Sequence, residues 1–324
     1  MQLFYDPRDG KVFEREFFWL DDLGARPLNE ADPEEAGFLF ASARPIDDYE
    51  RLVKPFPSIL DRPGDRAPLL RLDRTLRALE HAGVQIPQPR TWYLELDQEP
   101  PPDMPFPVFV RTAKTSWKLG GQISRVSNRR DFLDEAFELR RAVGWNECIL
   151  AREWLDLAEA GQTRWGPLPQ EIRVWIVDGV PFAWSFHHLH VVPSPAGFPP
   201  SNRDLGTLRD YAGQVGRAFS SRLIAADFAR LTSGGWVFIE AGAGSCAGTG
   251  HEGVYKAVAS RLDGSESRLH RQRNRWFVQG LTAVQHPGHD DAFADRLFLL
   301  MARGRAPQAA LVAAYPASGC VIRH

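Results

Sequence analysis

Two acidic residues, Asp227 and Glu240, lie in apolar segments on either side of a short turn signal, and this arrangement could bind a cation. With Ser233-Gly234 as a two-residue loop, or residues 232–235 as a four-residue loop, an antiparallel hairpin places Asp227 opposite Glu240. Like charges in that position destabilise a sheet. The pair therefore requires a hard divalent ion, a shared proton or open water, and the residues alone favour metal and solvent equally.

A second hairpin is predicted around the Asp178-Gly179 turn, and its register brings several polar side chains together. Arg173 is expected opposite Trp184 and on one face with His188 and His190, so these residues form a candidate substrate face. Partly buried structural histidines are the favoured alternative for the two imidazoles. A simple stacking contact with Trp184 is the alternative for Arg173.

A lysine-containing loop precedes both hairpins. The chain has 34 arginines and five lysines, yet Lys114 and Lys118 lie within five residues of each other, just before Gly120-Gly121. Backbone amides of a glycine-containing loop approach phosphate oxygens closely, and a compact ammonium adds charge there. An ordinary solvated turn is the alternative.

Composition and charge limit the classes of function. The chain has 324 residues, 44% of them hydrophobic and 25% charged, and a formal net charge of −2. This composition is typical of a globular protein and provides no overall attraction for nucleic acid or membranes. No apolar run has membrane-spanning length and residues 1–10 lack signal-peptide features, so we expect a cytoplasmic protein. The three cysteines are expected to be reduced thiols.

Hydrophobic periodicity and turn residues predict the elements that position these side chains. They are a helix from Leu69 to Gly83, strands at 91–96, 108–111, 123–126 and 148–155, a helix capped by Ser127 that ends near Gly144, and a helix at 208–219.

Taken in order, five pieces resemble an ATP-grasp domain, and their order is more specific than any one of them. They are Val108–Arg111, Lys114–Gly121, Ile149–Leu155, Glu171–Gly179 and Ala226–Glu240. The chain looks closest to short phage and bacterial ATP-grasp proteins of uncertain substrate.

The resemblance implies an α+β ATP-grasp fold in which two α+β lobes enclose ATP. We expect lobe one at about 66–150 and lobe two at about 151–262. Residues 1–65 are expected to form a small mixed domain, and residues 263–324 a partly helical extension.

The resemblance also implies how ATP is held. Arg111 occupies the strand position where a lysine usually approaches the α-phosphate, and Lys114 and Lys118 belong to the lid over the phosphates. The adenine-reading hinge, which acts mostly through backbone groups, corresponds to Glu153, Trp154 and Leu155.

For the reaction centre, the resemblance assigns Arg173 to the γ-phosphate or the acylphosphate, and Asp227 and Glu240 to Mg²⁺, which Mn²⁺ could replace. A planar guanidinium suits the charge that collects on a transferred phosphoryl group. One departure is plain, because Gly242 occupies the place where the family often has a third ligand, asparagine. A water, Ser245 or a bidentate Glu240 could substitute.

These expectations together predict an ATP-dependent ligase that joins a carboxylate to an amine through an acylphosphate, with ATP and a small-molecule or peptide substrate as partners. One alternative is an ATP-grasp enzyme acting on RNA or another phosphorylated substrate, for which the basic run at residues 268–275 would be the contact. The other is a non-catalytic nucleotide-binding sensor, which the missing asparagine favours.

Overall fold

The computed structural model describes residues 2–9, 24–41, 44–95, 98–114, 125–163, 166–186, 200–247, 258 and 261–262. The predicted extension at 263–324, the basic run at 268–275, Lys118, His188 and His190 all lie outside these residues. None of the helices in the described part is long and apolar enough to cross a membrane.

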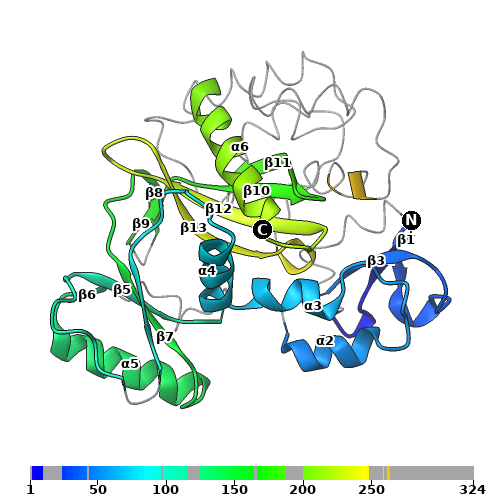
Figure 1. The fold of residues 1–324 in the computed structure, drawn as a ribbon, viewed down its shortest axis with the longest axis horizontal. Helices are drawn as coiled ribbons and strands as arrows, with labels where there is room; N and C mark the ends of the chain where they lie inside the picture. Colours follow the sequence, from blue (N-terminus) through cyan, green and yellow to red (C-terminus); the bar gives the residue numbers. More distant parts are fainter. Residues whose placement is uncertain are drawn as a thin grey trace.

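The first unit of the chain is a parallel sheet of order β2-β1-β3 with short helices beside it (Figure 1). Fully buried Phe4, Leu39 and Tyr49 belong to its separate core. Its elements are β1 (Gln2–Tyr5), η1 (Pro7–Asp9), β2 (Arg26–Pro27), η4 (Leu28–Glu30), β3 (Gly37–Phe40), α2 (Ile46–Val53) and α3 (Pro63–Arg66).

Lobe one is an antiparallel sheet of order β4-β7-β5-β6 on which a long helix packs (Figure 1). The helix begins one residue later than predicted, because Asn128 and not Ser127 is its N-cap and accepts a hydrogen bond from the Asp131 N–H at 3.0 Å. Its end at Gly144 is confirmed. The elements are β4 (Thr91–Leu94), β5 (Val108–Thr112), β6 (Arg125–Val126), α5 (Arg129–Val143) and β7 (Ile149–Glu153).

Lobe two is an antiparallel sheet of order β11-β10-β12-β13, and α6 packs against its strands. The helix begins earlier than predicted because Ser201 and Asp204 form a capping box. A small hairpin, β8-β9, replaces the polar loop expected before β10. The elements are β8 (Glu159–Thr163), β9 (Gly166–Pro169), β10 (Glu171–Val177), β11 (Val180–Phe186), α6 (Asn202–Arg217), β12 (Leu223–Arg230), β13 (Trp236–Ala243) and η7 (Gly244–Cys246).

The β10–β11 register is predicted correctly only next to its turn. Asp178 (φ 50°) and Gly179 (φ 76°) form the expected two-residue turn with positive φ at both positions. Beyond Pro181 the register shifts by one residue, because Phe182 is an extra residue on the edge strand. Proline has no N–H to donate to the ladder, so a bulge beside it is physically reasonable. Every more distant pair in this hairpin was therefore predicted wrongly.

The β12–β13 hairpin differs from the prediction at two places whose effects cancel. Around its turn, the Leu231 N–H donates to the Gly235 carbonyl at 3.1 Å, which makes the loop one residue different from both predicted lengths. A one-residue bulge at Ile239 then shifts the register back. Asp227 consequently lies opposite Glu240, as predicted.

The two lobes are joined by the segment between the first unit and β4. It contains η5 (Ala67–Leu70) and α4 (Leu72–His81), and both pack against β13 of lobe two (Figure 1). The first unit is tied to lobe two by the buried Asp61 carboxylate. Its two oxygens accept hydrogen bonds from the hydroxyl groups of Ser221 at 3.1 Å and Ser245 at 2.8 Å.

Candidate functional site

Three charged side chains lie at one level across the lobe-two sheet. Arg173 on β10 is paired with Asp227 on β12, which is paired with Glu240 on β13. The Arg173 guanidinium donates to both Asp227 oxygens, with Nε–Oδ1 and Nη2–Oδ2 distances of 2.8 Å each. This is the bidentate geometry that makes arginine–carboxylate pairs strong. Both side chains are buried, so the pair is shielded from water.

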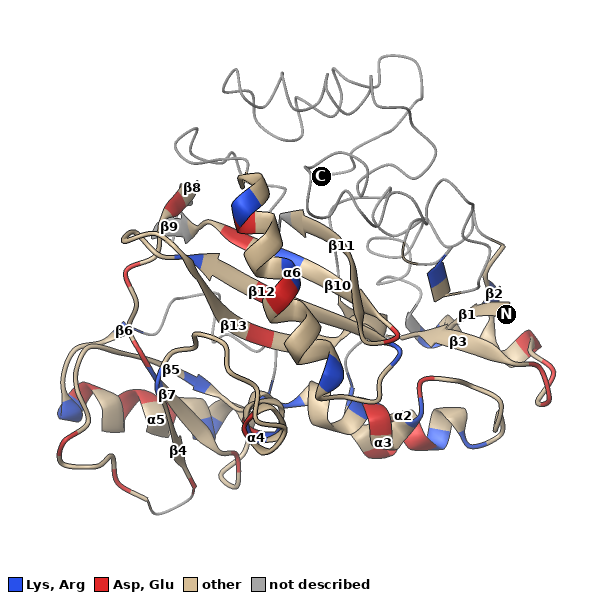
Figure 2. Ribbon diagram, turned by 45° about the horizontal axis from the view of Figure 1, so that its top comes forward, with Lys and Arg blue, Asp and Glu red and all other residues tan. Residues whose placement is uncertain are grey.

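Lobe one completes this row with Arg111. Its Nη1 donates to Glu240 Oε2 at 2.6 Å, and its Nη2 donates to the Lys114 carbonyl at 3.3 Å. Figure 2 shows the basic stretch on β5 and the acidic stretch on β13 in the two neighbouring lobes. We call Arg173, Asp227, Glu240 and Arg111 the charged row. It connects the lobes directly.

A fourth basic side chain, Arg152 on β7, lies beside the row. It is 3% exposed, and its Nη1 donates to the carbonyl of Ile239, the bulge residue, at 2.6 Å. Burial and the neighbouring Arg111 charge lower the pKa of Arg152 to about 10, although Glu240 acts in the other direction. Burial also acts to lower the pKa of Arg173, but the charge and hydrogen bonds of Asp227 outweigh it and raise that pKa above its usual value.

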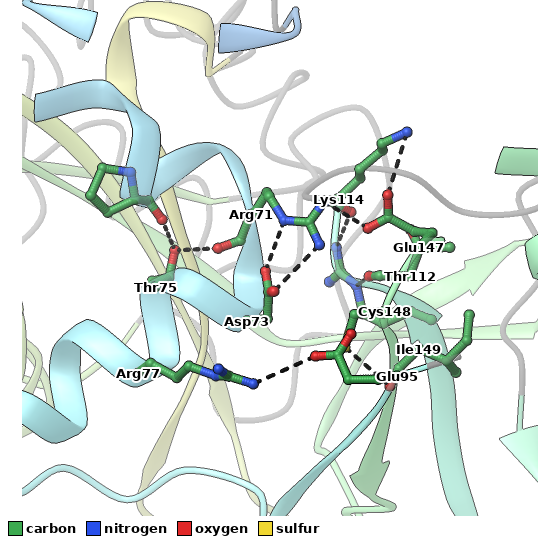
Figure 3. Close-up of polar contacts among 12 residues, drawn as sticks. Arg71, Asp73, Thr75, Arg77, Glu95, Thr112, Lys114, Glu147, Cys148 and Ile149 are labelled. Atoms are coloured by element: carbon green, nitrogen blue, oxygen red, sulfur yellow. Dashed lines mark hydrogen bonds and ion pairs between the residues drawn. The ribbon is translucent and has the colours of Figure 1, made fainter. Parts of the chain in front are cut away.

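The start of the lysine loop is held by a buried acid. Glu147, which is 7% exposed, forms ion pairs with Arg71 at 2.9 Å and with Lys114 Nζ at 3.5 Å (Figure 3). Arg71 is in turn hydrogen-bonded to Asp73, with an Nε–Oδ1 distance of 3.1 Å. The Lys114 side chain is 47% exposed, so it is anchored near the row yet accessible to solvent.

The predicted hinge residues lie where the chain passes from lobe one to lobe two. The Glu153 N–H donates to the Arg90 carbonyl at 2.8 Å, and the Trp154 N–H donates to the Pro107 carbonyl at 3.3 Å. These two donors are therefore engaged within lobe one and are not oriented toward a base. Leu155 follows them and is half-buried.

The predicted substrate face needs correction at Trp184. The Phe182 bulge places Ser185 opposite Arg173 and pairs Trp184 with Val174, so Trp184 lies on the other face of the sheet. Its side chain is fully buried in the core. The position of Trp184 thus belongs to the packing of lobe two.

The carboxylates of the row fit Mg²⁺ as a site that is completed by phosphate. Mg²⁺ is commonly held by one or two carboxylates together with substrate phosphates. Among the described residues, no group of three or more His, Cys, Asp or Glu is arranged to hold a metal ion. Ser245 is engaged with Asp61, which argues against its use as the third ligand. Gly242 lies beside Glu240 on the same face, and a side-chain Cβ there would meet only the Leu69 carbonyl, at 3.7 Å.

Sequence reasoning missed Arg152 and Glu147. Arg152 did carry a signal, because it is a charged residue inside the otherwise apolar strand Ile149–Glu153. Glu147 precedes that strand and has no local pattern that marks it. Its partners Arg71 and Lys114 are distant in sequence, so only the folded chain brings the three together.

The two lobes, their antiparallel sheets and the helices packed on them define an α+β ATP-grasp fold. The chain belongs to the ATP-grasp domain family. The model that matches it describes an ATP-grasp domain, the third family of its clade, and covers residues 70–262, more than half of the chain. Members of the ATP-grasp family are typically ATP-dependent carboxylate–amine ligases and generally bind ATP with Mg²⁺.

Three solved structures are similar to the chain. A RimK domain ATP-grasp protein from Sphaerobacter thermophilus DSM 20745 has 13% identity and a TM-score of 0.49, covering 81% of this chain and 95% of that one. VanG D-Ala:D-Ser ligase from Enterococcus faecalis has 13% identity and a TM-score of 0.47, covering 65% and 64%. The D-alanine-D-alanine ligase from Coxiella burnetii has 12% identity and a TM-score of 0.47, covering 65% and 59%. The chain thus spans less than two thirds of the length of either ligase. The curated proteins gave no match.

Proposed function

We propose that the protein is an ATP-dependent ligase that joins a carboxylate to an amine through an acylphosphate, with residues 66–262 as its ATP-grasp domain. The observation that supports this most is the charged row, in which two carboxylates and two arginines meet between the lobes. Acids for a metal ion and guanidinium groups for phosphate oxygens are the two requirements of phosphoryl transfer. The substrate pair is not specified by these residues.

In this proposal the residues of the row have separate tasks. Arg111 and the anchored Lys114 hold the phosphate chain, and Arg173 neutralises the charge that collects on the transferred phosphoryl group. Asp227 and Glu240 would hold Mg²⁺, which when bound neutralises phosphate charge and orients the phosphate oxygens. Because each acid is paired with an arginine, the ligand-free site is already close to electrically balanced.

The chemistry requires no nucleophile from the protein. A substrate carboxylate oxygen attacks the γ-phosphorus, and the bond to ADP breaks. The amine nitrogen of the second substrate then attacks the acyl carbon, inorganic phosphate departs with the bonding electrons, and the amine loses a proton. The protein contributes orientation and electrostatic stabilisation.

The test is release of ADP from ATP and Mg²⁺ with pools of amino acids, peptides and RNA. Wild type is expected to release ADP with a pool that contains both a carboxylate and an amine substrate. Asp227→Asn and Glu240→Gln should each remove at least 90% of that activity, because about 1.4 kcal/mol of lost transition-state stabilisation is a tenfold change in rate.

Asp178→Asn is the matched control for Asp227→Asn. Asp178 forms a similar bidentate pair with Arg222, at 2.6 and 2.9 Å, but at the surface and away from the row. Asparagine also tolerates the positive φ of this position. The control should retain wild-type activity. The ligase proposal fails if no pool stimulates ADP release, or if the two site variants behave like Asp178→Asn.

A non-catalytic nucleotide sensor is the second candidate. It is favoured by the pairing of both carboxylates with arginines and by the glycine at position 242. A sensor would bind ATP without ADP release in any pool, so the same assay separates the two functions when it is combined with a binding measurement. Stimulation by the RNA pool alone would instead favour a nucleic-acid substrate.

A further inference from the structure

The Arg152 guanidinium has a buried donor that the fold does not use. Its Nη1 is bound to the Ile239 carbonyl, and its Nε lies 3.4 Å from Thr91 Oγ1. Its Nη2 is buried, and among the described residues nothing accepts a hydrogen bond from it. A buried charged donor without an acceptor costs free energy, so its presence calls for an explanation.

Strand geometry directs Arg152 to the same place as Arg111. On the paired strands β5 and β7, Arg111 lies opposite Leu150 and Arg152 lies opposite Phe109, so both arginines share one face of the lobe-one sheet. The opposite face, which includes Val110 and Ala151, packs into the lobe-one core. The shared face is the one from which Arg111 and Arg152 contact β13 of lobe two.

The local charges leave Arg152 without a partner. Arg111 takes the Glu240 carboxylate at 2.6 Å, and Arg152 has no carboxylate within ion-pair distance among the described residues. Two guanidinium groups thus face one carboxylate at the boundary between the lobes. An anion that enters beside Arg111 would accept the Nη2 hydrogen bond and balance the second positive charge.

We propose that Arg152 is a phosphate-binding residue, in which Nη1 fixes the Ile239 bulge while Nη2 donates, together with Arg111, to an oxygen of the nucleotide's phosphate chain. This inference rests on the proposed nucleotide binding but not on ligase turnover. A planar fork that is anchored through one nitrogen presents the other in a fixed position, which favours recognition of a phosphate oxygen. The competing explanation is a purely structural cap on the Ile239 carbonyl.

The experiment compares affinities for adenosine, AMP, ADP and ATP, measured by calorimetry without substrate, in wild type and Arg152→Met. We expect Arg152→Met to weaken ADP and ATP binding by about 10- to 100-fold, as for loss of a hydrogen bond to a charged group, and to leave adenosine binding unchanged. Arg152→Lys retains the charge but not the fork, so it should recover only part of the loss.

Arg140→Met is the matched control. Arg140 on α5 also donates to backbone carbonyls, those of Leu94 at 3.1 Å and Glu95 at 2.7 Å, and its Nε is buried without an acceptor among the described residues. It lies on the helix side of lobe one, so Arg140→Met should not change any nucleotide affinity. Thermal unfolding of both variants identifies the temperature range in which each is folded.

The outcomes separate this inference from the proposed function. Equal ADP affinity in wild type and Arg152→Met overturns the phosphate role, and so does an equal loss for adenosine and ADP. If wild type binds no nucleotide, both proposals fail. If wild type and Arg152→Met differ as expected while no substrate pool gives ADP release, the phosphate role stands and the ligase proposal falls.

Discussion

Removal of the Asp227 charge should destabilise the fold far more than removal of an equivalent surface charge. In Asp227→Asn, the amide NH₂ group faces an Arg173 donor, and the buried guanidinium loses its bidentate partner. Breaking a buried ion pair from one side costs about 3–5 kcal/mol. Glu240 and Glu171 still act to raise the pKa of Arg173, so we expect a value near the lower limit, about 3 kcal/mol.

The assay is thermal unfolding of wild type, Asp227→Asn and the surface control Asp178→Asn, followed by circular dichroism without nucleotide. For a domain of this size, about 3 kcal/mol lowers Tm by about 6–12 °C. The control pair, whose side chains are 46% and 27% exposed, should contribute no more than about 1 kcal/mol, or about 4 °C. Equal shifts in the two variants would refute the reasoning about burial.

A double variant separates the cost of an unpaired charge from the value of the pair. Arg173→Met combined with Asp227→Leu replaces both charges by apolar groups, which is often neutral or stabilising in a buried position. We expect its Tm to lie well above that of Asp227→Asn, while ADP release remains lost. A double variant as unstable as Asp227→Asn would mean that the ion pair itself, and not the unpaired Arg173, determines the stability.

Three further predictions concern single positions. Gly242→Asn should tighten Mg²⁺ binding in the presence of ATP by about tenfold, or about 1.4 kcal/mol, whereas Gly242→Ala should not, because there is room for a side chain beside Glu240; equal Mg²⁺ titrations would count against this. Gly206→Ala should stabilise α6 by up to about 1 kcal/mol, whereas Gly216→Ala should destabilise the protein in urea unfolding because its Cβ would lie 2.5 Å from the Gly179 carbonyl oxygen; the opposite order would contradict the packing. Glu147→Gln should cost about 1–3 kcal/mol in the same assay because Arg71 and Lys114 lose a buried anion, and an unchanged midpoint would show that these pairs are weak.

Local signals allowed much of lobe one and lobe two to be predicted. Helix α5 follows a 3.6-residue pattern that ends at a glycine, and β5 and β7 are apolar runs between turn residues. These features depend on residues that are close in sequence. The errors at the start of α5 and α6 have the same origin, because neighbouring polar residues compete for the cap position and only the folded geometry selects Asn128 or Ser201.

Bulges explain where the sequence-based site prediction failed. A bulge at Phe182 moved Trp184 to the opposite face from Arg173, since one extra residue inverts every side chain beyond it. The bulge at Ile239 had the reverse effect, because it cancelled an error in the loop length and preserved the predicted partner of Asp227. Alternation of apolar and polar residues does not reveal an inserted residue.

The sequence alone determined which acids face each other, because Asp227 and Glu240 lie on two strands that a short loop connects. Only the tertiary structure decided what those acids contact. Arg173 reaches Asp227 because β10 lies next to β12, and Arg111 reaches Glu240 across 129 positions of sequence. Such contacts follow from the packing of one lobe on the other, which buries apolar surface contributed by the whole chain. No local pattern of residues encodes that arrangement.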